Sequence, residues 1–340
     1  MTKNNKNRDL KTANDYAEGI LHGDRIVLGR AITLAESRRI EHQALVREIL
    51  EQCLPCTGNS LRIGISGSPG VGKSSFIETF GSYLTQEQGR RLAVLAIDPT
   101  SQVSRGSILG DKTRMSQLST DPRAFIRPSP AGDSLGGVAA RTREAMLLCE
   151  AAGFDTILIE TVGVGQSETT VHGMVDFFLL LLLPGAGDEL QGIKRGIVEM
   201  ADLLAINKAD GDRIELAKAA RKEYAGALHL FPPKPSGWPA KTVTCSALTG
   251  RGIPEIWQLV LDFQQITKES GWFVNNRKDQ AKQWLHELIA QLLKAQFYEN
   301  EAVRAQLPEM EDAVVENKLP IAKAADRLID LFKKSGQAAI

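Results

Sequence analysis

Glycines, a lysine and a serine stand at a defined spacing in residues 67–74, which read GSPGVGKS. This is the pattern of glycine, four residues, glycine, lysine and serine or threonine. Backbone N–H groups of such a loop surround phosphates, the lysine reaches the β and γ phosphates, and the last hydroxyl binds Mg²⁺. A glycine turn that only joins a strand to a helix is the alternative. The residues expected to contact phosphate are Gly67, Ser68, Pro69, Gly70, Val71, Gly72, Lys73, Ser74 and Ser75.

The segments on either side of this loop have the periodicities that the motif requires. Residues 61–66 form a short, mostly apolar run that is typical of a buried strand, and residues 75–88 carry apolar side chains at helical spacing. The order of strand, loop and helix favours a nucleotide-binding loop over an ordinary turn.

A second motif, NKAD at residues 207–210, follows another apolar strand candidate. Its carboxylate can accept hydrogen bonds from the N1–H and the exocyclic amine of guanine, whereas adenine offers no matching donors. Alone, the motif could cap a helix, but after a P-loop it predicts GTP and GDP as ligands in preference to ATP. Residues 246–248 resemble the GTPase loop whose backbone N–H contacts guanine O6. The residues expected at the base are Asn207, Lys208, Asp210, Ser246, Ala247 and Leu248.

Carboxylates at the ends of strand candidates are the expected partners of Mg²⁺. Asp98 follows the strand after the P-loop helix, Glu160 ends a later strand, and the hydroxyl of Ser74 completes the candidates. A carboxylate at a strand end can instead cap the next turn.

The sequence after Glu160 predicts slow hydrolysis. Gly163 stands where its N–H can sense the γ phosphate, but Val164 follows it in place of the glutamine that orients water in small signalling GTPases. Lys73 is expected to act on the phosphates, and a further charged group would have to complete the site, where a well-placed cation is worth about 10³ to 10⁵ in rate. Candidates for that group are Asp111, Arg114 and Lys194, each of which could instead be a solvated surface charge.

Composition and local runs limit the partners and the compartment. Lysine plus arginine equals aspartate plus glutamate at 41 each, so bulk charge favours neither nucleic acid nor an anionic membrane. The first twelve residues lack the apolar centre of a signal peptide, and residues 175–183 are too few to span a bilayer as a helix. Four cysteines are typical of a reducing compartment, so we expect a cytoplasmic protein. Cys53 and Cys56 form an isolated C-x-x-C pair, for which metal or redox chemistry is the alternative to a helix end with buried thiols.

Strand and helix patterns alternate along the middle of the chain and predict an α/β fold with a doubly wound, mostly parallel sheet. The expected strands are residues 61–66, 91–97, 155–160, 175–183, 203–207 and 241–245. Helical patterns precede this region and follow it. The expected domains are a helical extension at residues 1–56, a P-loop GTPase domain at 57–268 and a helical, dimer-forming arm at 269–340.

Several longer segments resemble the methylmalonyl-CoA mutase-associated GTPases, bacterial relatives of the human protein that is mutated in a form of methylmalonic aciduria. The resemblance begins near residues 24–25 and extends through the GTPase domain, and more loosely into the helical tail. Two departures from the family pattern are Arg105 and residues 184–186 (PGA). The segments that carry the resemblance are residues 31–37 (AITLAES), 98–100 (DPT), 106–115 (GSILGDKTRM), 160–168 (ETVGVGQSE) and 187–194 (GDELQGIK).

The resemblance implies a homodimeric G protein of the broad group that includes signal-recognition and nickel-insertion GTPases. It would bind a B12-dependent acyl-CoA mutase, gate adenosylcobalamin loading and help to remove damaged cofactor. By the same resemblance, Asp98, Asp111 and Glu160 lie near Mg²⁺, and residues 160–168 and 187–195 are switches. Older usage names the family an arginine/ornithine transport-system kinase, so a kinase of periplasmic transport proteins is one alternative and a nickel-delivering metallochaperone GTPase is another.

Overall fold

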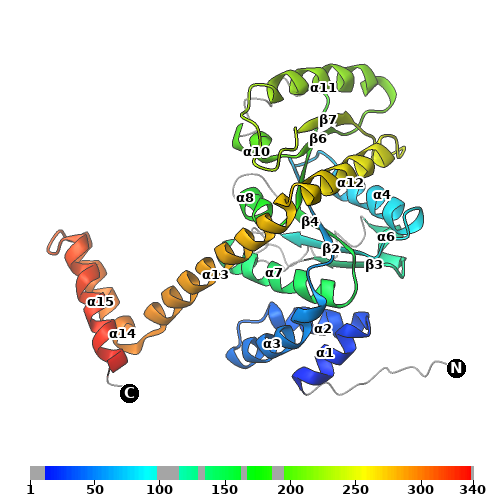
Figure 1. Cartoon of the computed structure of the whole chain (residues 1–340). Helices are drawn as coiled ribbons and strands as arrows, with labels where there is room; N and C mark the ends of the chain where they lie inside the picture. Colours follow the sequence, from blue (N-terminus) through cyan, green and yellow to red (C-terminus); the bar gives the residue numbers. More distant parts are fainter. Residues whose placement is uncertain (1–11, 98–114, 129–134, 162–166, 186–194, 338–340) are drawn as a thin grey trace. The chain divides into compact units, whose positions relative to one another are not determined.

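The computed structural model of the 340-residue chain describes residues 12–97, 115–128, 135–161, 167–185 and 195–337. Figure 1 shows a central sheet with helices on both faces and further helices toward both ends of the chain. The described residues divide between two compact units, Met1–Gln280 and Ala281–Ile340.

Seven parallel strands form the sheet in the order β3-β2-β4-β1-β5-β6-β7. The doubly wound parallel sheet predicted from the sequence is therefore confirmed. The order changes direction beside β1, where the chain crosses from one side of the sheet to the other, and ligands bind at the carboxyl edge of such a point. The strands are β1 (Leu61–Gly67), β2 (Leu92–Ile97), β3 (Ala124–Pro128), β4 (Thr156–Thr161), β5 (Phe177–Leu182), β6 (Leu203–Ile206) and β7 (Lys241–Thr244).

The two faces of the sheet are covered by different helices. Ile63 and Ile65 of β1 belong to a buried core that includes Phe76 and Phe80 of α4 and Trp257 of α12. Gly64 faces the other way, where a Cβ would lie 2.9 Å from Val171 of α8, so a larger side chain there has no space. The helices of this part of the chain are α4 (Lys73–Gln86), α6 (Ser116–Thr120), α7 (Leu135–Ala151), α8 (Ser167–His172), α10 (Arg195–Met200), α11 (Ile214–Leu228) and α12 (Ile253–Glu269), with the short 3-10 turn η2 (Gly211–Arg213).

Helices precede the sheet, as the sequence predicted; there are three in the described residues, and they pack on one another and on α7. They are α1 (Ala13–Leu21), α2 (Arg25–Ala35) and α3 (Ile40–Cys53), followed by the 3-10 turn η1 (Leu54–Cys56). Asp24 accepts hydrogen bonds from the first N–H groups of α2, which fixes where that helix begins. Arg127 at the end of β3 forms an ion pair with Glu36 after α2, so this layer is joined to the sheet edge by charge as well as by packing.

The C-terminal helices are α13 (Trp272–Glu299), α14 (Glu301–Val315) and α15 (Ile321–Gln337). The first residues of α13 belong to the first unit, where Arg277 bonds to Asp176. In the second unit, Phe297 and Phe332 pack edge to face, with ring centroids 5.5 Å apart, and Asn300 bonds to Ser335. The predicted three-part domain division remains a prediction.

Among the described helices, none is both long enough and apolar enough to cross a membrane.

Candidate nucleotide site

The GSPGVGKS loop connects the carboxyl end of β1 to the first residue of α4. Gly72 caps the helix with φ of +95°, a conformation that side chains disfavour. A Cβ on Gly72 would also lie 3.0 Å from Nδ2 of Asn207. Glycine is therefore required there for two reasons, the backbone conformation and the close approach of the base motif.

Lys73 curls back over its own loop. Its Nζ donates to the carbonyl oxygens of Gly67 at 2.8 Å and of Ser68 at 3.3 Å. Burial lowers the pKa of Lys73, and the negative charges of Glu160 and Glu168 oppose that change. The ammonium therefore lies in the field of two carboxylates, and it can exchange its carbonyl partners for phosphate oxygens.

Glu160 lies near the end of β4, next to the P-loop strand β1. It pairs with Ile65 in the register of β4 and β1 and is buried. The next residue, Thr161, donates from its hydroxyl to Ser66 at 2.9 Å, which ties the two strand ends together. Glu160 is thus placed at the edge where the phosphates are expected.

Glu168 is a site residue that the motif analysis did not select. It lies in the first turn of α8 and is only 1% exposed, although it is acidic. Its negative charge acts to raise the pKa of Lys73, against the effect of burial. The signal in the sequence was its position in the ETVGVGQSE segment, but only the fold shows that this carboxylate is buried and that its charge acts on the lysine.

The base motif is joined directly to the phosphate loop. Asn207 follows β6, and its Nδ2 donates to the Val71 carbonyl oxygen at 2.9 Å. Lys208 donates from Nζ to the Gly70 carbonyl oxygen at 2.7 Å and has φ of +59°. A lysine in the left-handed region is strained, and such strain is concentrated at functional sites. The two motifs, about 140 residues apart in the sequence, therefore form one site.

The second part of the base site follows β7. Ser246 is fully buried and donates from its hydroxyl to the Asp210 carboxylate, which orients that carboxylate. The N–H of Ala247 donates to Oδ1 of Asn207 at 3.1 Å, and the thiol of Cys245 lies 3.7 Å from the same oxygen. Burial raises the pKa of Cys245 to about 12, so its thiol stays protonated and can act as a donor.

Five predicted site residues lie outside the described part of the chain: Asp98, Asp111, Arg114, Gly163 and Lys194. Their proposed roles at Mg²⁺ and the γ phosphate remain predictions. Within the described ranges, Ser74 follows Lys73 at the start of α4 and is half-buried. The same ranges contain no cluster of three histidine, cysteine or acidic side chains that could hold a metal.

The C-x-x-C pair lies away from these loops, at the end of α3 and in η1. Cys53 is buried and Cys56 is exposed. Burial and the neighbouring Cys56 raise the pKa of the Cys53 thiol to about 11. A metal ligand or an attacking thiol must be deprotonated, so this environment disfavours both roles at Cys53.

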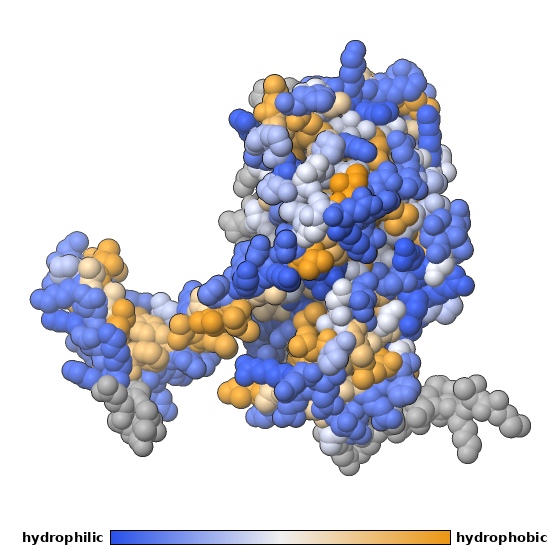
Figure 2. Space-filling model, in the orientation of Figure 1, coloured by the Kyte–Doolittle hydropathy of each residue, from blue (hydrophilic) through white to orange (hydrophobic). Residues whose placement is uncertain are grey.

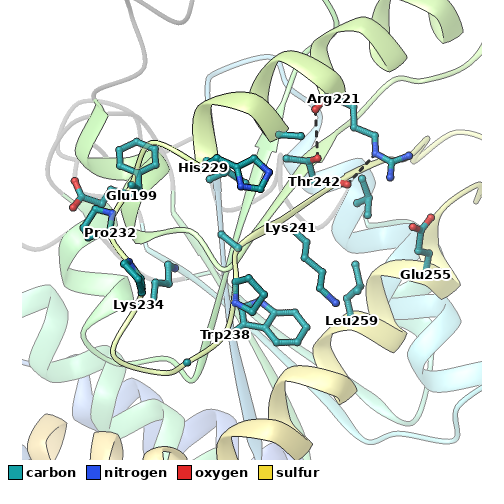
Figure 3. A pocket seen from close by; sticks show the side chains of 18 residues that line it. Glu199, Arg221, His229, Pro232, Lys234, Trp238, Lys241, Thr242, Glu255 and Leu259 are labelled. Atoms are coloured by element: carbon teal, nitrogen blue, oxygen red, sulfur yellow. Dashed lines mark hydrogen bonds between the residues drawn. The ribbon is translucent and has the colours of Figure 1, made fainter.

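Two cavities are lined by residues outside both nucleotide motifs. The larger has a volume of about 540 Å³ and is bordered by α11, β7 and α12. Figure 3 shows Trp238 and Lys241 in the wall of this cavity. The Lys241 ammonium lies 4.3 Å from the centroid of the Trp238 indole ring. The indole N–H of Trp238 donates to the Asp202 carbonyl oxygen. The smaller, about 450 Å³, contains Asp176, Asp202 and Lys234. Neither cavity includes a residue of the P-loop or of the base motif.

Comparisons with known proteins agree with this site. Residues 28–302 match the family model described as "Methylmalonyl Co-A mutase-associated GTPase MeaB". The chain is 49% identical over 325 residues to the mouse "Methylmalonic aciduria type A homolog, mitochondrial", covering 93% of this chain and 78% of the relative. It is 49% identical over 279 residues to "GTPase ArgK" of Escherichia coli, covering 82% and 84%.

A solved structure, described as an LAO/AO transport system kinase, aligns with a TM-score of 0.75 and 38% identity, covering 96% of this chain and all of that one. Sequence and fold thus agree across nearly the whole length. The chain belongs to the MeaB family of methylmalonyl-CoA mutase-associated GTPases.

Proposed function

We propose that this GTPase is a chaperone for methylmalonyl-CoA mutase or a related B12-dependent acyl-CoA mutase. It would gate the loading of adenosylcobalamin and protect or reactivate the enzyme. The observation that carries the proposal is the family match over residues 28–302. It is supported by the bonds of Asn207 and Lys208 to the phosphate loop, which place the NKAD motif beside that loop, as a guanine nucleotide site would require.

The chain's own residues would act mainly by positioning. Lys73 would exchange the carbonyl oxygens of Gly67 and Ser68 for phosphate oxygens. Asp210, oriented by Ser246, would accept from the guanine edge. The Lys208 stem would pack on the purine face.

Mg²⁺ is the metal that the P-loop chemistry implies. The hydroxyl of Ser74 and the carboxylate of Glu160 fit it, since both are hard oxygen ligands near Lys73. Asp98 and Asp111 are proposed to complete the set. When bound, the ion supplies positive charge to the phosphate oxygens.

Hydrolysis by the isolated protein is expected to be slow because Val164 follows Gly163. Asp111, Arg114, Lys194 or a group from the mutase would complete the site. A partner that places such a group would accelerate turnover, which would couple hydrolysis to the state of the mutase.

We also propose that the protein is a homodimer. In the second unit, apolar side chains at helical spacing along α13 are exposed, and Figure 2 shows apolar surface on these helices. Contiguous apolar surface on a water-facing helix is typical of a protein interface. The residues are Leu285, Leu288, Ile289, Leu292 and Leu293.

Two alternative functions have less support. A kinase of periplasmic transport proteins would need no guanine-specific motif, whereas residues 207–210 of this chain read NKAD and bond to the phosphate loop. A metallochaperone would need a metal-binding cluster, for which Cys53 and Cys56 are the candidates. A protonated Cys53 disfavours that role.

The experiment that tests the proposal is GTP and ATP hydrolysis by the purified protein, alone and with a B12-dependent acyl-CoA mutase from the same organism. Slow GTP turnover that rises with the mutase, with ATP inert, is the expected result. GTP turnover that is unchanged by the mutase would refute the proposed partner but would leave the GTPase activity supported. A preference for ATP would refute the base assignment and favour the kinase.

Two variants serve as controls. Lys73→Ala should abolish productive nucleotide binding, and Asp210→Asn should weaken GTP without creating ATP binding, because the amide cannot replace the acceptor pair. Normal GTP turnover in either variant would contradict the site assignment.

A further inference from the structure

Thr79, in the second turn of the P-loop helix, bonds to the base loop. Its hydroxyl donates to the carbonyl oxygen of Ala247 at 2.6 Å, a contact between residues 168 positions apart in the sequence. Thr79 belongs to neither nucleotide motif. It connects the helix that begins at Lys73 to the loop that follows β7.

Ala247 is held on both sides by this arrangement. Its N–H donates to Oδ1 of Asn207 at 3.1 Å, and its carbonyl oxygen accepts from Thr79 at 2.6 Å. Two different elements, the base motif and the P-loop helix, therefore fix the two peptide groups that flank one residue.

The carbonyl of Ala247 shares a peptide plane with the N–H of Leu248. Because a trans peptide is planar, its oxygen and its hydrogen point in opposite directions. The bond from Thr79 thus turns the Leu248 N–H away from α4. Leu248 is 84% exposed, and no hydrogen bond of the described residues uses its N–H.

The rest of the loop does not fix this peptide group. Ser246 accepts from the N–H groups of Thr249 and Gly250, and its own N–H donates to Arg251, which closes the turn around Leu248. These bonds hold the ends of the loop. Only Thr79 bonds to the peptide oxygen of Ala247 within the described structure.

We propose that Thr79 is a positioning residue for base selectivity: it orients the Ala247–Leu248 peptide so that the Leu248 N–H donates to the 6-oxo group of guanine. The inference rests on the guanine site proposed above. A purine with an amine at position 6 has no acceptor there, so it gains nothing from this orientation.

The neighbouring Glu78 provides a matched control. Its carboxylate accepts from the N–H groups of Gln117 at 2.7 Å and Leu118 at 3.3 Å, at the start of α6. Removing it perturbs the same turn of α4 without touching the base loop.

The test is the dissociation constant of three diphosphates, measured by calorimetry for the wild type, Thr79→Val, Thr79→Ser and Glu78→Ala. GDP and IDP both carry the 6-oxo group, whereas 2,6-diaminopurine riboside diphosphate carries an amine in its place. Thr79→Val should weaken GDP and IDP by about three- to tenfold, the size of one neutral hydrogen bond, and leave the diaminopurine nucleotide unchanged. Thr79→Ser and Glu78→Ala should both show the wild-type ratio between the dissociation constant of GDP and that of the diaminopurine nucleotide.

Each of the other possible results of this binding test has a definite interpretation. An equal loss for all three nucleotides in Thr79→Val, or no loss at all, would overturn the positioning role. A lower unfolding temperature of the nucleotide-free variant with an unchanged affinity ratio would show that the bond is structural only. If the wild type bound ADP as tightly as GDP, the guanine assignment itself would be refuted. This result is distinct from a failure of the positioning role of Thr79, which only the variants reveal.

Discussion

Asn207 joins the two nucleotide-binding loops, since its Nδ2 donates to the Val71 carbonyl oxygen while its Oδ1 accepts from the Ala247 N–H. Its side chain is buried, at 1% exposure. Replacement by alanine would leave the buried Val71 carbonyl and the partly buried Ala247 N–H without their side-chain partner, at a combined cost of roughly 1 to 3 kcal/mol. The phosphate loop and the base loop would then no longer be held in fixed positions relative to each other.

We therefore expect Asn207→Ala to weaken GDP binding by about 10- to 100-fold and to lower the free energy of unfolding of the nucleotide-free protein by roughly 1 to 3 kcal/mol. Calorimetry with GDP and urea unfolding measure the two effects. Unchanged GDP affinity in a folded variant would contradict the role of Asn207 as the link between the loops.

The ion pair of Asp176 and Arg277 predicts a second, purely structural effect. Arg277 donates from Nε and Nη2 to the Asp176 carboxylate at 2.7 and 2.6 Å, and the two side chains are 14% and 1% exposed. Arg277→Met leaves the buried carboxylate without its counter-charge, which typically costs about 3 to 5 kcal/mol. The free energy of unfolding, measured in urea, should fall by that amount.

The exposed pair of Lys218 and Glu215 is the matched control for that measurement. Its side chains are 57% and 80% exposed, so Lys218→Met should change the unfolding free energy by less than about 0.5 kcal/mol. Equal effects of the two substitutions would show that burial does not set the strength of the Asp176 pair.

Glu144 of α7 predicts a pH dependence. Burial raises the pKa of its carboxyl group from 4.5 to about 7, and the charges of Arg141 and Arg47 only partly oppose this. Between pH 4.5 and 7 the native state holds a proton that the unfolded state releases, so the free energy of unfolding falls as the pH rises through this window. The free-energy cost of ionising the buried Glu144 carboxyl group is absent below pH 4.5 and complete above pH 7.

Glu144→Gln should therefore be more stable than the wild type at pH 8, by roughly 1 to 3 kcal/mol, and equally stable near pH 4. Thermal or urea unfolding at both pH values measures the difference. Lower stability of Glu144→Gln at pH 8 would mean that the arginine neighbours stabilise the charged carboxylate by more than burial destabilises it, so that the pKa of Glu144 is not raised.

The parts of the fold that local patterns could predict are those whose signal is continuous in the sequence. The P-loop helix, the base motif and six strands, the P-loop strand among them, have such signals. Strand β3 does not: it is short, it carries Arg127 and Pro128, and it pairs on one side only, with β2. An edge strand with a polar face has little periodicity to detect.

Contacts between distant segments could not be predicted for a different reason. No spacing rule connects Thr79 to Ala247, or the charge of Glu168 to Lys73, because each interaction depends on how the sheet brings strand ends together. Motifs identified which residues bind phosphate and base, but the residues that support them carry no motif of their own.

The four cysteines provide a test of both burial and the C-x-x-C pair. All four are free thiols, and Cys56 is the exposed one, whereas Cys53, Cys149 and Cys245 are buried. Burial raises the pKa of each buried thiol, to about 11 for Cys53 and about 12 for Cys245, so the reactive thiolate is scarce at neutral pH. We expect a disulfide reagent such as Ellman's reagent to modify one thiol per chain rapidly at pH 8, and four after denaturation.

Cys56→Ser should abolish the fast reaction, and Cys53→Ser should leave it unchanged. A redox or metal-binding pair would behave differently, because both members must be accessible and deprotonated to act. Two fast thiols in the native protein, or protection of Cys56 by stoichiometric Zn²⁺ that is lost in Cys53→Ser, would contradict the buried, protonated state of Cys53 and favour the metallochaperone alternative.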